Sequence, residues 1–164
     1  MEIDIKKTPL NEQEIFEQLK VEDEDKYLTF SLEHQLYGIE ILQIREIIKP
    51  ITVTRLPNTP LYILGVINLR GEIIPVIDIK KRFGLERIQF SANTRIIVVE
   101  INGKLLGLYV ESVHQVVPIR RGEIEQPQED IAGISINFFS GYKTLKGSIL
   151  LILAIENLIE EITC

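Results

Sequence analysis

Apolar and polar residues alternate along most of the chain from residue 27 onward, with the period of two that is typical of β-strands. In residues 27–33, Leu28, Phe30 and Leu32 alternate with polar side chains, and residues 35–41 follow after a short polar turn. Isoleucine is frequent throughout, and its branched side chain favours sheet over helix. The pattern predicts about ten short strands, and therefore a mainly β protein.

Three later stretches have the pattern of a β-hairpin, in which two apolar strands meet at a dipeptide that ends in glycine. The dipeptides are Arg70-Gly71, Asn102-Gly103 and Lys146-Gly147. Glycine permits the positive φ angle that a tight two-residue turn requires, so each dipeptide is expected to reverse the chain. Pro75 lacks an amide hydrogen, so we expect it at an edge position or a bulge.

Helical patterns are short and few. Helical turns are expected at residues 42–48 and 59–64, where Pro60 suits a first-turn position. Residues 156–162 carry their apolar side chains on one side and predict a C-terminal helix. Short strands with regularly spaced turns favour barrels or a sandwich over a layered α/β fold, and we expect two small barrels.

The first 26 residues differ from the rest in charge. They carry four lysines and nine acidic residues, whereas the remaining chain has 14 basic and 15 acidic residues. Asn11 can cap a short helix in this tail, with Glu14 at the capping-box position. The charge run at residues 21–26 favours the alternative, a frayed or loosely docked segment that stays solvated.

Composition narrows the function classes. With 45% apolar and 26% charged residues the chain reads as a globular protein, and it lacks the apolar run of about 18 residues that suggests a membrane span. The acidic start does not resemble a signal peptide, so we expect a cytoplasmic protein without membrane insertion. The nearly neutral body has no basic stripe for nucleic acid. Cys164 is the only cysteine, which excludes a disulfide framework.

The residues that could perform chemistry are scattered. His34 and His114 are the only histidines, and neither has a second histidine at metal-ligand spacing, so both are expected to be ordinary surface residues. Asp78 ends an apolar strand, where it is either a catalytic carboxylate or, as we favour, the cap of the following turn. Serine-elbow and phosphate-loop motifs are absent. The sequence therefore predicts a binding protein without catalytic residues, cofactor or metal.

Arg70 is the unusual residue of the hairpin in residues 65–79, because packing between two apolar strands does not require a guanidinium. It can stay solvated, or it can donate to carboxylates and carbonyls of a partner. Arginine beside apolar residues is the usual composition of an interface hot spot. The residues alone leave both alternatives open.

Residues 38–84 resemble the CheW family of chemotaxis coupling proteins. The resemblance rests on the combination of R-L-P-N-T-P, I-L-G-V-I-N-L-R-G and I-I-P-V-I-D along this stretch. It continues more weakly to residue 160, which suggests a domain of residues 27–160, approximately divided into 27–88 and 89–160. Ala154 departs from the family pattern, which has an acidic residue there, and Lys146-Gly147 replaces a more acidic turn.

The resemblance implies a non-catalytic scaffold of two five-stranded SH3-like barrels that share an apolar core. Such proteins couple the cytoplasmic tip of methyl-accepting chemoreceptors to the regulatory domain of the histidine kinase CheA at membrane receptor arrays. That kinase domain has the same fold, so coupler and kinase can alternate in rings. We expect a monomer when the protein is free. The alternatives are an adaptor of a non-flagellar pathway, the kinase domain itself, a CheV coupler and an unrecognised small β-barrel enzyme.

The resemblance also implies a receptor-binding groove between the barrels. An amphipathic helix in a groove needs an apolar floor and a few polar groups that fix its register. The groove residues carried over are Ile44, Glu46, Val66 (or Ile67), Asn68, Leu69, Arg70 and Gly71. For the kinase we expect an exposed barrel end, and the candidates at the tight second hairpin are Asn102, Gly103 and Lys104.

Overall fold

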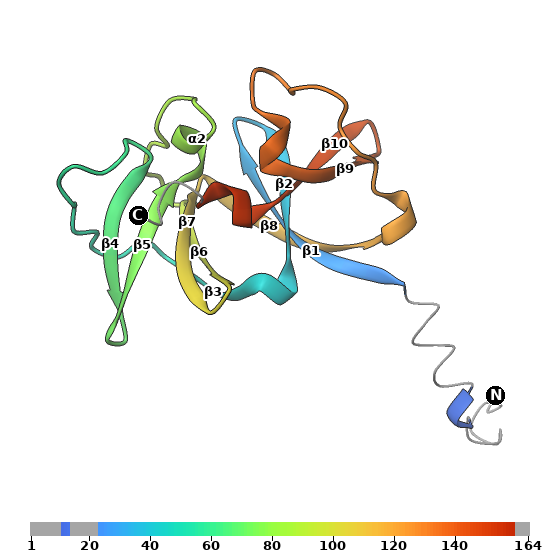
Figure 1. Ribbon diagram of the computed structural model, residues 1–164, viewed down its shortest axis with the longest axis horizontal. Coiled ribbons are helices and arrows are strands. Elements are labelled where there is room, and N and C mark those ends of the chain that lie inside the picture. The colour runs from blue at the N-terminus through green and yellow to red at the C-terminus, as the bar shows by residue number, and fades with distance from the viewer. Residues whose placement is uncertain (1–10, 14–22, 160–164) are drawn as a thin grey trace.

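The computed structural model describes residues 11–13 and 23–159, and the strands within residues 24–153 form two barrels that lie side by side (Figure 1). The central barrel takes its strands from the middle of the sequence, in the order β3-β6-β7-β5-β4. Its strands are β3 (Ile44–Ile48), β4 (Ile63–Leu69), β5 (Glu72–Asp78), β6 (Arg95–Ile101) and β7 (Lys104–Val110).

The terminal barrel combines strands from both ends of the described chain, in the order β8-β1-β2-β10-β9. Its strands are β1 (Glu24–Leu32), β2 (Gln35–Glu40), β8 (Ser112–Arg120), β9 (Phe139–Leu145) and β10 (Ser148–Leu153). The predicted mainly β fold with two five-stranded units is confirmed. The approximate division at residue 88 does not correspond to these sheets, because the terminal barrel is completed by strands more than a hundred residues apart.

The helical predictions were less accurate. Residues 44–48 form strand β3, because they pair with β6, and only a short 3-10 turn, η2 (Ile41–Gln43), precedes them. Residues 60–63 form a turn closed by the Ile63 amide donating to the Pro60 carbonyl at 3.0 Å, and β4 begins at Ile63, so no helix forms there. The first prediction is therefore right only at Leu42 and Gln43 and wrong for residues 44–48, and the second is wrong, since strand pairing overrides a weak local signal.

The remaining helices are short. They are α2 (Ile79–Arg82) and the 3-10 segments η3 (Arg121–Glu123), η4 (Ile136–Phe138) and η5 (Ile155–Leu158). The predicted C-terminal helix is present as η5, and its expected continuation at residues 160–162 lies outside the described residues. Glu12 and Gln13 are helical, whereas the rest of the predicted N-terminal helix also lies outside them.

The expected boundary of the acidic tail at residue 26 is also corrected. Strand β1 begins at Glu24, which pairs with Arg120 of β8. Arg121 forms ion pairs with Asp23 at 2.8 Å and Asp25 at 3.1 Å, so this part of the charge run is not merely solvated. The acidic residues next to the domain hold the first strand against β8.

One apolar core is shared by both barrels, as the family resemblance implied. Its main cluster contains Phe30 and Tyr37 of the terminal barrel together with Ile77 and Ile97 of the central barrel. The ring of Phe83, which follows α2, lies 5.5 Å from that of Tyr37. Aromatic side chains therefore join the barrels through the part of the core where they meet.

The two barrels repeat one arrangement of strands. In the terminal barrel β2 runs parallel to β10, with Gly38 opposite Ile152, and in the central barrel β7 runs parallel to β5, with Gly107 opposite Val76. Each barrel also has a register shift where its edge strand pairs with the next strand of the sheet. The shift lies between β8 and β1 in the terminal barrel and between β3 and β6 in the central barrel. By this register, the turn at Lys146 is the counterpart of the turn at Arg70.

Pro75 lies in β5, an interior strand, so the expected edge position is wrong, whereas the alternative of a bulge is close to what the structure shows, because the β4–β5 register shifts between Ile63 and Gly65, next to the Val66–Pro75 pair. Its antiparallel partner Val66 exchanges both of its backbone hydrogen bonds with Thr54, on the other side of β4. Pairing of β5 with β7 begins only at Val76. The proline therefore occupies a place in β5 where the ladder requires no amide hydrogen.

Candidate functional site

The Arg70-Gly71 turn closes the β4–β5 hairpin as predicted. Leu69 pairs with Glu72, and the two turn residues have φ angles of 52° and 89°, as a primed two-residue turn requires. The Asn68 side chain accepts a hydrogen bond from the Gly71 amide at 3.0 Å, which further fixes the turn. The sequence thus places Arg70 at the tip of a rigid hairpin.

The guanidinium of Arg70 pairs with the carboxylate of Glu46 through Nη2 and Oε2. Glu46 lies on β3 and Arg70 at the end of β4, and these are the two outermost strands of the five-stranded sheet. The ion pair therefore joins the two ends of the sheet where the barrel closes. Arg70 nevertheless remains 70% exposed, and Glu46 27% exposed, so the pair is accessible to a partner.

This internal pairing was missing from the sequence analysis, which weighed only a solvated Arg70 and one bound to a partner. The structure adds a third arrangement, in which the arginine is held by its own chain and still presents donors outward. It also brings together Glu46 and Arg70, which the sequence had assigned to the same groove. The charge–charge contact fixes the direction in which the guanidinium points.

The expected apolar floor is only partly as predicted. Ile44, Val66 and Leu69 are half-buried, so each offers some apolar surface. Ile67, the alternative to Val66, is 1% exposed within the core of the central barrel and faces inward. Because side chains alternate across a strand, only Val66 of this pair can contribute to an outer surface.

Three exposed apolar residues near the same elements escaped the sequence analysis. Leu42 in η2 is 85% exposed, Ile73 in β5 is 62% exposed, and Ile47 in β3 is also exposed. The sequence did offer a signal for Ile73. Adjacent residues of a strand face opposite sides, so of Ile73 and Ile74 only one, here Ile74, can be buried in the barrel. These side chains add exposed apolar surface on η2, β3 and β5.

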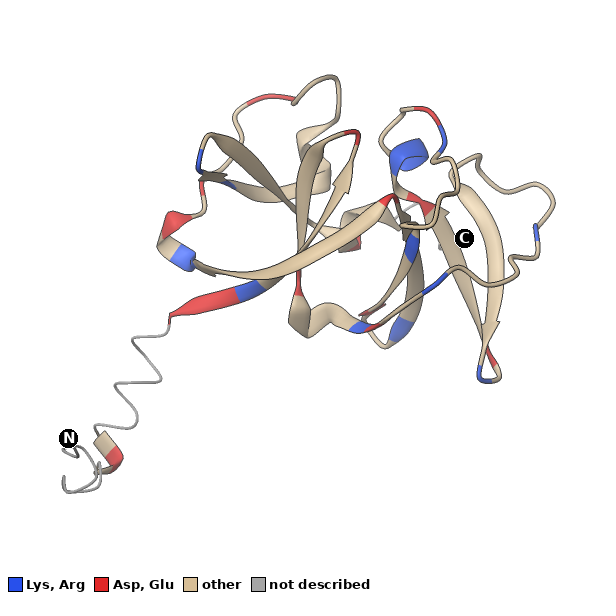
Figure 2. Cartoon of the chain, turned by 180° about the vertical axis from the view of Figure 1, so that it is seen from behind, with Lys and Arg blue, Asp and Glu red and all other residues tan. Residues whose placement is uncertain are grey.

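Charged groups border this surface. Arg45 of β3 pairs with Glu100 of β6, and hydrogen bonding and charge from Glu100 raise the pKa of the Arg45 guanidinium. At the hairpin tip, at lower right in Figure 2, basic Arg70 is followed by acidic Glu72. Exposed apolar residues with a rim of both charges are the usual composition of a protein interface.

The kinase candidates lie on a second hairpin of the same barrel. Asn102 and Gly103 have φ angles of 51° and 79°, and Ile101 pairs with Lys104, so the predicted tight turn is confirmed. All three candidate residues are exposed. In Figure 1 this turn and the Arg70 turn project from the same lower end of the central barrel.

The residues considered for catalysis have other roles. Asp78 is fully buried, and its carboxylate accepts from the amides of Lys81 at 3.0 Å and Ile88 at 2.8 Å, so it caps α2 as favoured. His34 is exposed in the β1–β2 turn. Within residues 11–13 and 23–159, His, Cys, Asp and Glu form no group of three that could hold a metal ion.

Comparison with known proteins assigns the family. Residues 26–163 match the CheW-like domain family. The chain belongs to this family. It is 33% identical over 136 residues to the chemotaxis protein CheW of Klebsiella aerogenes, covering 83% of this chain and 82% of that protein. With CheW of Helicobacter pylori the identity is 32% over 145 residues, covering 87% of each.

A solved structure agrees with this assignment. The crystal structure of the scaffolding protein TtCheW from Thermoanaerobacter tengcongensis is similar, with a TM-score of 0.77, 42% identity, and coverage of 83% of this chain and 88% of that one. The CheW-like protein described here is accordingly a non-catalytic chemotaxis adaptor. Among its described residues, no helix is long and apolar enough to cross a membrane.

Proposed function

We propose that this CheW-like adaptor couples the cytoplasmic tip of methyl-accepting chemoreceptors to the regulatory domain of the histidine kinase CheA. The observation that carries the proposal is the Arg70–Glu46 pair, an accessible charge fixed beside exposed apolar side chains. The same residues lie in the stretch on which the family resemblance rests. The protein would act in the cytoplasm, as a monomer when free, and be recruited to receptor arrays at the membrane.

In this proposal the receptor contacts the Arg70 hairpin and the neighbouring edge of β3. Ile44, Val66 and Leu69 contribute apolar surface, and Arg70 with Glu46 fixes the register of a receptor helix. Asn68 and Gly71 maintain the turn, as their hydrogen bond of 3.0 Å indicates. We add exposed Leu42 to this surface, because η2 leads directly into β3.

The kinase regulatory domain would contact the β6–β7 turn at Asn102, Gly103 and Lys104. This turn is rigid and its glycine has open space around it, so a partner backbone can approach closely. Receptor and kinase would then bind near one end of the central barrel, close enough for a change in one to affect the other. Alternation of coupler and kinase in rings would extend this coupling over many kinase subunits.

Size-exclusion chromatography of the adaptor with a receptor-tip fragment and the kinase regulatory domain tests the proposal. Lys104→Glu should abolish co-elution of the kinase domain and leave receptor binding intact, because a charge reversal at the turn opposes only that contact. Lys146→Glu is the matched control, because Lys146, like Lys104, is exposed and lies next to the glycine of a two-residue turn. Failure of wild type to bind either partner would contradict the coupling function, and loss of the kinase domain in neither variant would contradict the site at Lys104.

A further inference from the structure

His114 and two serines form a hydrogen-bonded cluster on strands β1 and β8 of the terminal barrel, outside the two hairpins of the proposed function. His114 Nε2 lies 2.9 Å from Ser31 Oγ and 3.2 Å from Ser112 Oγ, and the two hydroxyl oxygens are 2.8 Å apart. A neutral imidazole nitrogen that accepts needs only one of the two hydroxyl hydrogens. The other hydroxyl donates to the first at 2.8 Å, and it can turn this hydrogen to a ligand when that bond is given up.

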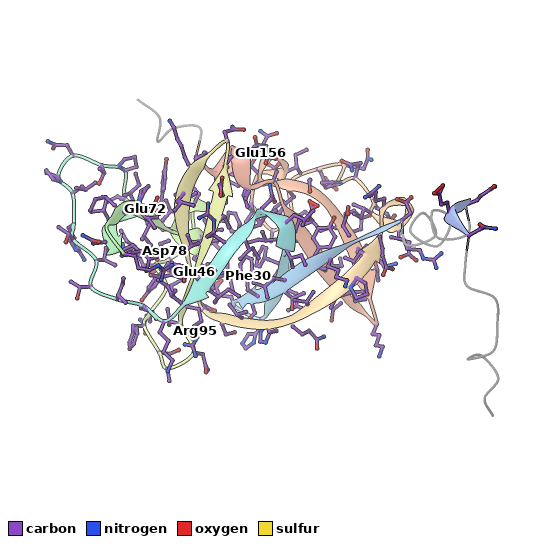
Figure 3. The ribbon with its side chains drawn as sticks, turned by 90° about the horizontal axis from the view of Figure 1, so that it is seen from below. Phe30, Glu46, Glu72, Asp78, Arg95 and Glu156 are labelled. Carbon is purple, nitrogen blue, oxygen red and sulfur yellow. The ribbon has the colours of Figure 1, made fainter. Side chains whose placement is uncertain are left out.

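The cluster borders a cavity of about 260 Å³ at the junction of the two barrels. Its lining residues are Asn93, Arg95, Ser112, Val113 and His114. Arg95 is at the start of β6 in the central barrel, whereas Ser112 begins β8 in the terminal barrel, and Figure 3 shows Arg95 where these elements approach each other. A ligand in this cavity would contact both barrels.

Arg95 is held in place by its own loop. Its Nη1 donates to the carbonyl oxygens of Ala92 at 3.0 Å and Thr94 at 2.7 Å. The Thr94 hydroxyl in turn accepts from the Ser91 amide at 2.9 Å, so the loop is itself fixed. The guanidinium has five N–H donors in a planar fork, and those not used on the loop can bind a ligand without a large loss of side-chain entropy.

The cavity favours a negative charge. Its lining residues, all within the described part of the chain, include one arginine, donors from serine and asparagine, and no carboxylate. The acidic residue next to Ser112 is Glu111, whose oxygens bind the Glu33 amide at 2.8 Å and Lys80 Nζ at 3.2 Å. Lys80 also pairs with Glu33 at 3.3 Å, so it offsets the two carboxylates only in part, and the attraction for an anion comes from Arg95 and the neutral donors that line the cavity.

We propose that this cavity binds a phosphate group, either free phosphate or that of a small phosphomonoester. A fork of guanidinium donors combined with hydroxyl and amide donors is the chemistry that recognises phosphate oxygens. The volume is just below the roughly 300–1,000 Å³ of sites for drug-sized ligands, which suits a smaller ligand. Because the lining comes from both barrels, the bound phosphate stabilises one arrangement of the two.

Titration of the full chain with sodium phosphate, followed by ¹H–¹⁵N NMR at ionic strength kept constant with sodium chloride, tests this site. We expect saturable shifts at the amides of Asn93, Arg95, Ser112 and His114. Arg95→Gln should weaken binding about tenfold or more, as expected for loss of a charged hydrogen-bond donor. Arg55→Gln removes an exposed arginine in another loop and should leave binding unchanged.

Ser112→Ala is the second variant, because Arg95 also supports its loop and Arg95→Gln could disturb that loop. It should weaken binding several-fold while the remaining spectrum stays that of wild type. Phenyl phosphate in a parallel titration distinguishes the ligand: binding of both supports a phosphomonoester site, and binding of inorganic phosphate alone supports a site for the free ion. Shifts that do not saturate, or equal weakening by Arg55→Gln, would overturn the proposal.

Discussion

The Arg70-Gly71 hairpin of the central barrel and the Lys146-Gly147 hairpin of the terminal barrel have the same backbone and different chemistry. Their φ angles are 52° and 89° in the first and 39° and 84° in the second. In both, the strand after the turn runs parallel to a strand of the other hairpin in its barrel. The fold therefore presents two equivalent hairpin tips.

Charged contacts distinguish the two tips. Arg70 pairs with Glu46, whereas Gln115 of β8 occupies the position that corresponds to Glu46 by strand register, and Lys146 forms no ion pair among the described residues. The capping Asp78 likewise has Ala154 as its counterpart, and the Ala154 side chain makes no cap hydrogen bond. The repeat preserves the backbone and the core, whereas the ion pair at the hairpin tip and the carboxylate cap occur at these equivalent positions only in the central barrel.

Exposed apolar residues, in contrast, occur at both tips. Ile73 is 62% exposed and its counterpart Ile149 is 46% exposed, and Ile47 and Val116 form a second exposed pair of equivalent residues. Apolar exposure alone therefore does not distinguish the tips. If one of them binds the receptor, the distinguishing feature has to be the fixed charge at Arg70.

The largest effect is expected at the glycines where a loop crosses each barrel. Gly65 has φ +146°, and a Cβ there would overlap the carbonyl oxygen of Thr54 and lie 2.7 Å from its carbon. Gly65→Ala should lower the free energy of unfolding by about 4 kcal/mol, since overpacking adds to backbone strain. Urea unfolding measures this.

The counterpart Gly141 calibrates that result. A Cβ at Gly141 would overlap a methyl group of Ile124, which can move, and lie 2.9 Å from the Glu125 carbonyl oxygen, without a positive φ angle. Gly141→Ala should therefore cost less, about 2 kcal/mol. Gly38→Ala, where the nearest atom is at 3.5 Å, is the control and should cost under about 1 kcal/mol. A larger loss at Gly141 than at Gly65 would contradict the account.

Next in size is the loss of the buried cap that only the central barrel has. Asp78→Ala removes the acceptor for the Lys81 and Ile88 amides and should destabilise by about 3 kcal/mol. Asp78→Asn keeps one oxygen acceptor and should lose less. Thermal unfolding monitored by circular dichroism compares the two. Equal stability of wild type and Asp78→Ala would show that the central barrel does not need this cap. The terminal barrel already has Ala154, which makes no side-chain cap bond, at the equivalent position.

An alkaline loss of stability is expected from Tyr37, which the terminal barrel contributes to the shared core. Burial, with smaller contributions from Glu33 and Glu111, raises the pKa of Tyr37 to about 12. Above pH 10 the unfolded chain loses this phenolic proton first, so stability falls as pH rises toward 12, by about 2–3 kcal/mol in total.

The control for this effect is the conservative variant Tyr37→Phe. It removes the phenolic proton and should show a smaller alkaline loss in urea unfolding at pH 10 to 12. Burial lowers the pKa of Lys80, but its bonds to Glu111 and Glu33 outweigh this and raise it, so Lys80 also loses stabilising charge at alkaline pH in both proteins. The difference between the two curves is therefore due to Tyr37, and identical curves would contradict its assigned pKa.

The smallest effect on stability is expected at the hairpin tips themselves. Arg70→Ala breaks an exposed ion pair and should cost no more than about 1 kcal/mol, because solvent screens such pairs. Lys146→Ala should cost even less. Urea midpoints of both variants provide the test. A large loss for Arg70→Ala would make the arginine a structural closure of the barrel and remove the reason to assign it to binding.

Much of the local structure was predictable because it depends on neighbouring residues. Alternating apolar positions predicted the strands, and the three X-Gly dipeptides predicted the turns. The sheet membership was not predictable, since the parallel pairing of β2 with β10 joins residues such as Gly38 and Ile152 that are far apart in the chain. The helical turn expected at residues 42–48 was only partly right for the same reason, because residues 44–48 pair with β6 and only Ile41–Gln43 form a 3-10 turn.

The candidate site was predictable only where a motif marked it. The N-L-R-G stretch identified Arg70, but its contact with Glu46 depends on how the sheet curves until its two edges meet. The exposure of Leu42 depends on the path of η2 between the barrels, which local sequence does not determine. The assignments of both hairpins to partners remain proposals.

Calorimetric titration with a receptor cytoplasmic-tip fragment, comparing wild type, Arg70→Ala and Lys146→Ala, tests the central claim most directly. The account predicts that Arg70→Ala stays folded and binds the receptor more weakly by about 1–4 kcal/mol, as truncation of an interface arginine does. Lys146→Ala, at the equivalent tip without the ion pair, should bind like wild type. Equal binding by all three would contradict the assignment of the receptor surface to the Arg70 hairpin.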